Sequence, residues 1–194
     1  MSTFEYHRIS DLAESLENAG VDQEIIAQIL EGGEKILKGT DSVKKADWLR
    51  GAMYRMDSLL DKDTRHAVRE ACACCLGGKR QDLVKAIAKK GGTLEERIQA
   101  ANEARMVFGH SVSLQEDGRI LVCFSPEGLA NYRCVCLPQA KEPLPITYCY
   151  CCGGHVKHHL QIATGRSLEL TVKSSSLSSG GRRPCTFLFT VKEN

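Results

Sequence analysis

The feature that most constrains this chain is a short stretch, Tyr148–His159, that reads YCYCCGGHVKHH. It holds three cysteines, three histidines and two adjacent glycines. Thiol and imidazole groups are preferred zinc ligands, and packing alone gives no reason to gather so many of them. A second cysteine group, Cys134-Val-Cys136, lies just upstream, and a third, Cys72-Ala-Cys74-Cys75, lies far upstream. The sequence predicts that the three groups meet in space and form a thiol-rich site.

The ten cysteines are interpreted through the compartment in which the protein works. The opening residues, MSTFEYHRIS, lack the apolar core of a signal peptide, so we expect a cytoplasmic protein whose thiols stay reduced. In that compartment, metal binding or thiol chemistry explains the cysteines better than a disulfide framework does.

Charge and hydropathy exclude two classes of partner. Twenty-six basic and 24 acidic residues give a net charge of +2, which is too balanced for a nucleic-acid-binding surface. The longest apolar run, Ile120–Phe124, is too short to cross a membrane. We therefore expect neither nucleic acid nor a membrane as a partner.

The spacing of apolar residues predicts an α+β fold, with a helical N-terminal region over 1–105 and an α+β region over 106–194. The second region is expected to hold an antiparallel sheet with a helix packed on it, and the two regions are compatible with one continuous domain. In the first region, apolar residues at helical spacing and capping residues predict these helices: Val21–Leu30 with Asp22 as N-cap, Ser42–Leu60, Asp61–Cys75 stopped by Gly77-Gly78, Gln81–Lys90, and a helix capped by Thr93 with Glu96.

The pattern changes to strands near Val107. Glu116-Asp117-Gly118 is typical of a hairpin turn between two apolar runs. The remaining expected elements follow the same rules: a short strand over Arg133–Leu137, a helix over Cys151–Thr164 ending at Gly165, and strands over Ser167–Lys173 and Pro184–Val191.

Four of the cysteines form two Cys-x-Cys pairs, Cys134 with Cys136 and Cys149 with Cys151. Four thiolates are enough to close a tetrahedral zinc site. His155 lies four residues after Cys151, so the two share a face of the expected helix. The predicted metal is zinc, with an iron–sulfur cluster as the less favoured alternative. The predicted ligands are Cys134, Cys136, Cys149 and Cys151, with Cys72, Cys75 (three residues apart on the expected helix) and His155 as further candidates.

Other cysteines are better explained by packing, because free cysteine is among the most buried residue types. Cys152 shares an apolar stripe with Val156 and Leu160, so we expect it in the core. Cys123 and Cys185 lie in strand patterns beside apolar neighbours and are expected there too.

The C-terminal part of the chain resembles a known domain. Cys149, Gly154, the helix ending at Gly165-Arg166, the strand Leu168–Lys173, and then Gly181 and Cys185-Thr-Phe187 follow the pattern of the 4-vinyl reductase-like domain. The same pattern is similar to thiazoline-carboxylate hydrolase-like proteins and to their cysteine-rich bacterial and archaeal relatives. Those relatives carry the residues found here as Cys134, Cys136, Pro138, Cys149, Tyr150 and Cys151.

The resemblance implies an α+β module that holds a small hydrophobic molecule, in some members beside a zinc ion bound by cysteines. One departure matters here. The zinc-bearing members have cysteines in the last turn, where this chain has Ser174–Ser179, so only Cys185 matches their zinc site. Any metal must use the other cysteines.

Two functions follow from these features. The first is a cysteine-rich protein that binds zinc and binds or senses a small molecule. The second is a thiol-dependent hydrolase-like enzyme in which Cys149 or Cys151 is the nucleophile and His155 the base. A transcription regulator is a third reading, which the charge balance argues against.

Overall fold

The computed structural model describes residues 4–125 and 134–192. Its first part is helical, as the sequence predicts. These helices are α1 (His7–Asn18), α2 (Gln23–Ile29), η1 (Gly33–Lys35), α3 (Ser42–Leu59), α4 (Lys62–Ala71), α5 (Gly78–Lys90), α6 (Leu94–Glu103) and α7 (Arg105–Phe108).

Capping side chains set where several of these helices begin. Asp22, Asp41 and Asp61 each accept hydrogen bonds from amides of the following first turn, which have no partner inside the helix. Thr93 and Glu96 form a reciprocal capping box at the start of α6. The predicted caps at Asp22 and Thr93 are confirmed.

The predicted helix Asp61–Cys75 is wrong at its C-terminal end. α4 ends at Ala71, and the chain from Cys72 to α5 is irregular, with Cys75 at a left-handed φ of +61°. The glycine pair does not stop a helix, because Gly77 is the N-cap of α5 and Gly78 is its first residue. Cys72 and Cys75 therefore do not share a helix face.

The second part of the chain forms one antiparallel sheet. Its strands are β1 (Ser111–Leu114), β2 (Ile120–Ser125), β3 (Leu168–Ser174) and β4 (Cys185–Val191), in the order β1-β2-β4-β3. Burial alternates along β3, with Leu168, Leu170 and Val172 inside and the residues between them exposed, as period-two spacing predicts. Phe187 and Phe189 of β4 are likewise buried. The α+β fold is confirmed.

The predicted strand Arg133–Leu137 lies partly outside the described residues, since Arg133 is not among them. The rest of this segment is a turn, closed by a hydrogen bond of 3.1 Å from the Leu137 N–H to the Cys134 carbonyl. The predicted strand is therefore wrong. The turn instead brings Cys134 and Cys136 close together.

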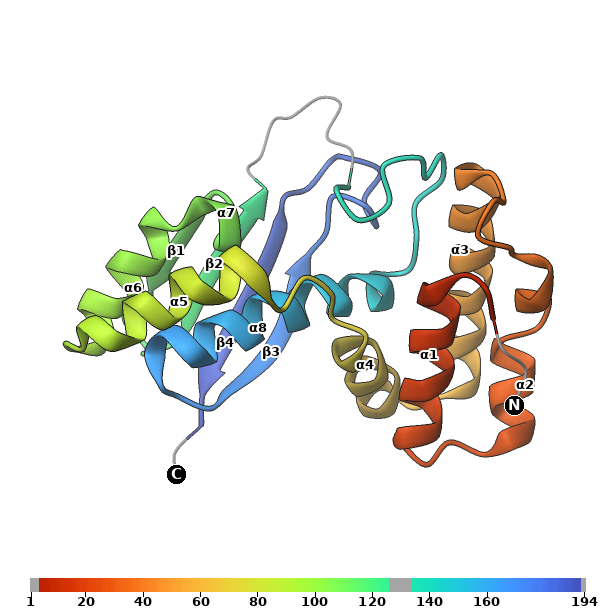
Figure 1. Cartoon of the computed structure of the whole chain (residues 1–194), viewed down its shortest axis with the longest axis horizontal. Coiled ribbons are helices and arrows are strands. Elements are labelled where there is room, and N and C mark those ends of the chain that lie inside the picture. The colour runs from red at the N-terminus through yellow and green to blue at the C-terminus, as the bar shows by residue number, and fades with distance from the viewer. Residues whose placement is uncertain (1–3, 126–133, 193–194) are drawn as a thin grey trace.

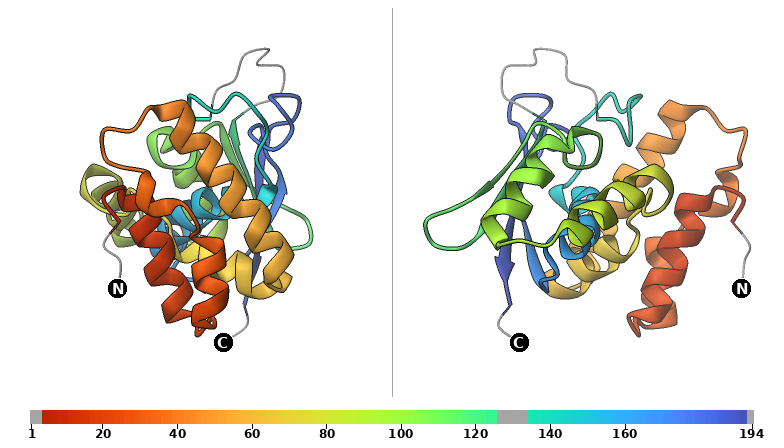
Figure 2. Two further views of the ribbon diagram at one scale, coloured as in Figure 1. Left: turned by 90° about the vertical axis from the view of Figure 1, so that its right-hand side faces the viewer. Right: turned by 60° about the vertical axis from the view of Figure 1, so that its left-hand side comes forward.

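The long helix α8 (Tyr150–Thr164) occupies the middle of the molecule, and it ends at Gly165, whose φ is +69°. Helices α5 to α8 lie over one face of the sheet, and α4 lies between α8 and the helices α1 to α3 (Figure 1). The right-hand view of Figure 2 shows α1 to α3, red to orange, at the end of the molecule farthest from the sheet. Within the described parts of the chain, no helix combines the length and apolar character that a membrane crossing needs.

Candidate thiol site

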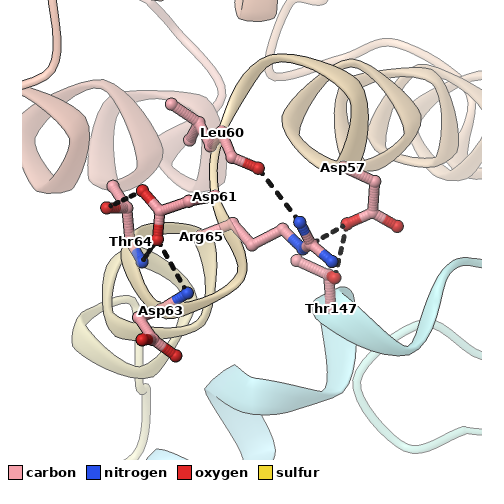
Figure 3. A network of polar contacts seen from close by, with 7 residues as sticks. All are labelled: Asp57, Leu60, Asp61, Asp63, Thr64, Arg65 and Thr147. Carbon is pink, nitrogen blue, oxygen red and sulfur yellow. Dashed lines mark hydrogen bonds and ion pairs between the residues drawn. The ribbon is translucent and has the colours of Figure 1, made fainter.

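The site begins at the N-terminal end of α8, which a polar network fixes against α3 and α4 (Figure 3). The short helix η2 (Ile146–Cys149) leads directly into α8. The Thr147 hydroxyl donates to Asp57 of α3 at 2.6 Å, and Arg65 of α4 pairs with the same carboxylate at 3.2 Å. One acidic side chain thus joins three elements just before the cysteines of α8.

The glycine pair lets α8 approach two neighbours closely. A Cβ on Gly153 would lie 2.5 Å from a methyl group of Leu170 in β3. A Cβ on Gly154 would lie 2.4 Å from the backbone oxygen of Glu70 in α4. The two glycines therefore allow α8 to fit between the sheet and α4, which brings its thiols close to the end of α4.

Two histidines of α8 hold the irregular segment that follows α4. The His155 Nδ1 lies 3.0 Å from the carbonyl oxygen of Cys74, and the His159 Nε2 lies 3.3 Å from that of Cys75. These partners explain why the chain leaves helical geometry there. His155 has a second backbone neighbour, because its Nε2 lies 3.3 Å from the Val107 carbonyl oxygen.

The three cysteine groups meet, as the sequence predicts. The Cys136 thiol has the thiols of Cys134, Cys152 and Cys74 as neighbours, and they raise its pKa. Cysteines of all three groups, Cys74, Cys136 and Cys151 among them, line one cavity. Cys75 is a further neighbour of Cys74. We call Cys74, Cys134, Cys136 and Cys152 the thiol cluster.

The thiol cluster favours a thiolate at Cys74 or at Cys134, one at a time, because Cys136 has a single proton to donate. The hydrogen bond from Cys136 lowers the pKa of Cys74 to about 5, against the opposing effect of burial, and Arg8 and His155 add to the lowering. A hydrogen bond from the same thiol lowers the pKa of Cys134 to about 6, and the backbone amides of Cys136 and Leu137 assist. The pKa of Cys136 is raised, because its proton is held by these sulfurs.

A cavity of about 220 Å³ opens beside the cluster. Two guanidinium groups line it. Arg69 is 4% exposed, and its Nη2 donates to the Tyr148 carbonyl at 3.4 Å. The Arg8 Nη1 donates to the Tyr148 hydroxyl at 2.6 Å. The other lining residues are Tyr148, His7, Asp11, Leu49, Cys72, Cys74, Cys75, Cys136 and Cys151.

Two of the predicted metal ligands lie near the thiol cluster but have other contacts of their own. The Cys149 thiol is buried and hydrogen-bonds with the Ser175 hydroxyl at 2.8 Å, and burial raises its pKa well above the usual range. Cys151 hydrogen-bonds with Arg69, and burial raises its pKa to about 11. The serine-rich turn Ser174–Ser179 thus supplies the partner of Cys149.

The further candidate ligands Cys72 and Cys75 also differ in their surroundings. Cys72 lies in the cavity wall and donates weakly to the Asp11 carbonyl at 3.7 Å. Cys75 is exposed next to Cys74. Sequence reasoning did not select Cys74 and Cys152, nor the two arginines. Cys74 was passed over because a continuous helix was assumed, and Cys152 because it shares the apolar stripe of α8, on which it is half-buried.

The cysteines of the three groups are free thiols, and within residues 4–125 and 134–192 no three His, Cys, Asp or Glu side chains are already arranged to hold a metal ion. Cys123 and Cys185 are half-buried, and both pack within or beside the sheet.

Comparison with known proteins gives a family. No curated protein and no solved structure matches the chain significantly. The model of a family of unknown function, DUF6144, matches residues 4–185, a span that includes all three cysteine groups and both arginines. The chain therefore belongs to DUF6144, a family of unknown function.

Proposed function

We propose that this protein binds a thiophilic metal ion, zinc before others, through the thiol cluster Cys74, Cys134, Cys136 and Cys152. The observation that carries the proposal is the position of Cys136, which lines one cavity with Cys74 and Cys151 of the two other cysteine groups and has Cys134 and Cys152 as further neighbours. Four thiolates satisfy zinc completely in tetrahedral geometry. The ligand set differs from the sequence prediction by exchanging Cys149 and Cys151 for Cys74 and Cys152.

Metal binding requires the sulfurs to lose their protons and to turn toward one point about 2.3 Å away. The site permits this movement. Cys74 is exposed in an irregular segment, and Cys134 and Cys136 lie in a turn. The lowered pKa values of Cys74 and Cys134 favour ionisation of one or the other of these thiols near neutral pH, because both depend on the single proton of Cys136. An iron–sulfur cluster uses the same ligands and is the second metal candidate.

A thiol enzyme remains a second candidate, but with a different nucleophile. Cys149 and Cys151 are buried with raised pKa values, and the described contacts of His155 are backbone carbonyls. Cys74, by contrast, is exposed and has a lowered pKa, which are the properties of a reactive thiol.

The test is the metal content of reduced protein purified without a metal-affinity tag. We expect about one zinc per chain, with the thiols of the cluster protected from alkylation until a chelator is added. Cys136→Ser and Cys152→Ser should lose the metal. Cys149→Ser is the matched control, since it lies three residues before Cys152 and should keep it.

Two results would overturn the zinc proposal. One is metal-free protein that takes up no zinc when it is offered, with selective alkylation of Cys74, which would favour the thiol enzyme. The other is loss of zinc in Cys149→Ser with retention in Cys152→Ser, which would restore the ligand set predicted from the sequence. A coloured protein with bound iron would assign the cluster to iron and sulfur instead.

A further inference from the structure

The cavity beside the thiol cluster contains a buried positive charge that no described carboxylate balances. Arg69 is 4% exposed, and removing a charged group from water is costly unless an opposite charge or full hydrogen bonding compensates. Among residues 4–125 and 134–192, no salt bridge includes Arg69. Its Nε has no hydrogen-bond partner.

The protein contacts of Arg69 do not use its full donor capacity. A guanidinium carries five N–H groups. The contacts of this one are the Tyr148 carbonyl at 3.4 Å, the face of the Tyr148 ring with its centre 5.0 Å away, and the thiols of Cys151 and Cys72. The carbonyl, the ring and the thiols are weak partners for a buried cation, so the group is left to find a stronger acceptor in the cavity.

A second guanidinium reaches the same space. Arg8 of α1 is half-buried, lines the cavity and is held in place by its hydrogen bond to the Tyr148 hydroxyl. Tyr148 therefore positions both arginines, one through its hydroxyl and the other through its carbonyl and ring. Asp11, the acidic residue in the wall, is exposed and makes no ion pair with either of them among the described residues.

We propose that this cavity binds a small molecule through an oxyanion, a carboxylate or a phosphate, held by Arg69 and Arg8. Two guanidinium groups facing one space match the planar, multiple acceptors of such groups. The volume of about 220 Å³ limits the ligand to a small molecule. The resemblance in sequence led us to expect a hydrophobic ligand, but the charge of the wall favours an anionic one.

The cavity and the proposed metal site are neighbours that share two residues. Cys74 and Cys136 line the cavity as well as belonging to the thiol cluster, so the far end of a bound molecule would face those sulfurs. Cys134 belongs to the thiol cluster and is not among the residues that line the cavity. The oxyanion proposal does not depend on zinc, and Cys134→Ser separates the two sites.

The experiment uses the full chain in a buffer free of other oxyanions, with inorganic phosphate and acetate as separate probes. Binding is measured by broadening of the ³¹P signal of phosphate and by relaxation of ¹³C-labelled acetate. We expect the wild type to bind at least one probe, and Arg69→Met and Arg8→Met each to weaken it by at least about tenfold, since each removes charge-assisted hydrogen bonds. Binding of one probe alone identifies the oxyanion class.

Controls keep the result interpretable. Arg166→Met removes an exposed arginine after α8 and should bind as the wild type does. Arg69→Met should melt no lower than the wild type in oxyanion-free buffer, because it removes an uncompensated buried charge. If it fails to fold, Arg8→Met decides. Cys134→Ser should keep anion binding whether or not it loses zinc. No binding by the wild type, or equal binding by both cavity variants, refutes the oxyanion site.

Discussion

At the scale of single residues, His155 and His159 of α8 contact backbone carbonyls of the segment that follows α4. His159 is fully buried, and its Nδ1 has no hydrogen-bond partner. Burial lowers its pKa to about 4, the Cys75 carbonyl opposes this, and the neighbouring His155, His158 and Arg80 lower it further. The folded protein therefore keeps the His159 imidazole neutral.

This makes stability depend on pH with a defined sign. Below pH 6.5 the unfolded chain takes up a proton at His159 that the folded chain refuses. The free energy of unfolding should therefore fall as the pH drops from 6.5 to about 4, with an upper limit of about 3 kcal/mol from this group. Urea unfolding of reduced, chelator-treated protein measures it. His159→Gln should show a shallower fall, and the exposed control His110→Gln should follow the wild type. Identical slopes for His159→Gln and the wild type would exclude this role.

At the scale of elements, the close contact between α8 and α4 depends on Gly154. An added Cβ would meet the Glu70 backbone oxygen at 2.4 Å, and backbone cannot turn aside. We expect Gly154→Ala to cost about 2 kcal/mol of stability despite the better helix propensity of alanine. Gly153→Ala should cost less, because it meets the end of the Leu170 side chain, and Gly51→Ala in α3 should be neutral or stabilising.

Thermal and urea unfolding of these three variants rank the effects. Zinc affinity gives a second readout, since moving α4 displaces Cys74, which follows it, from the rest of the thiol cluster. An order in which Gly154→Ala is the mildest change would mean that α4 and α8 are not packed as described.

Elements that depend on neighbouring residues in the sequence could be predicted, and those that depend on distant ones could not. The start of α2 after Asp22, the capping box of Thr93 and the alternation along β3 are local effects, and the sequence predicts all of them. The early end of α4 is different. It coincides with carbonyl contacts from His155 and His159, which lie more than eighty residues further along the chain.

The same distinction applies to the site. Clustering in sequence predicted that the three cysteine groups meet, and cysteines of all three line one cavity. The choice of Cys134 and Cys136 as metal ligands stays a prediction. Choosing between Cys151 and Cys152 as a metal ligand requires the direction of each side chain on α8. That direction depends on how α4 and Arg69 pack against α8. Arg69 itself gives no signal in the sequence, since a buried arginine and a solvated one look alike.

At the scale of the whole molecule, the helical region and the sheet share one core. A continuous cluster of buried apolar side chains includes residues from both, from Ile9 in α1 to Phe189 in β4. α8 belongs to the C-terminal region by sequence, yet its close neighbours include α4 through Gly154 and the cysteine segment through its histidines. Removing residues 1–105 would expose this side of α8 to water.

We therefore expect the two regions to unfold together. Trp48, the one tryptophan of the chain, lies in α3 and donates to the Glu31 carbonyl at 3.0 Å, so its fluorescence reports on the helical end. Far-UV circular dichroism reports on the whole fold. Urea midpoints from the two probes should coincide, as they do for a single cooperative unit. A fragment of residues 106–194 should lack stable tertiary structure, because burial of α8 requires α4 and α5. Separate midpoints, or a folded fragment, would instead establish two independent domains with the thiol cluster at their interface.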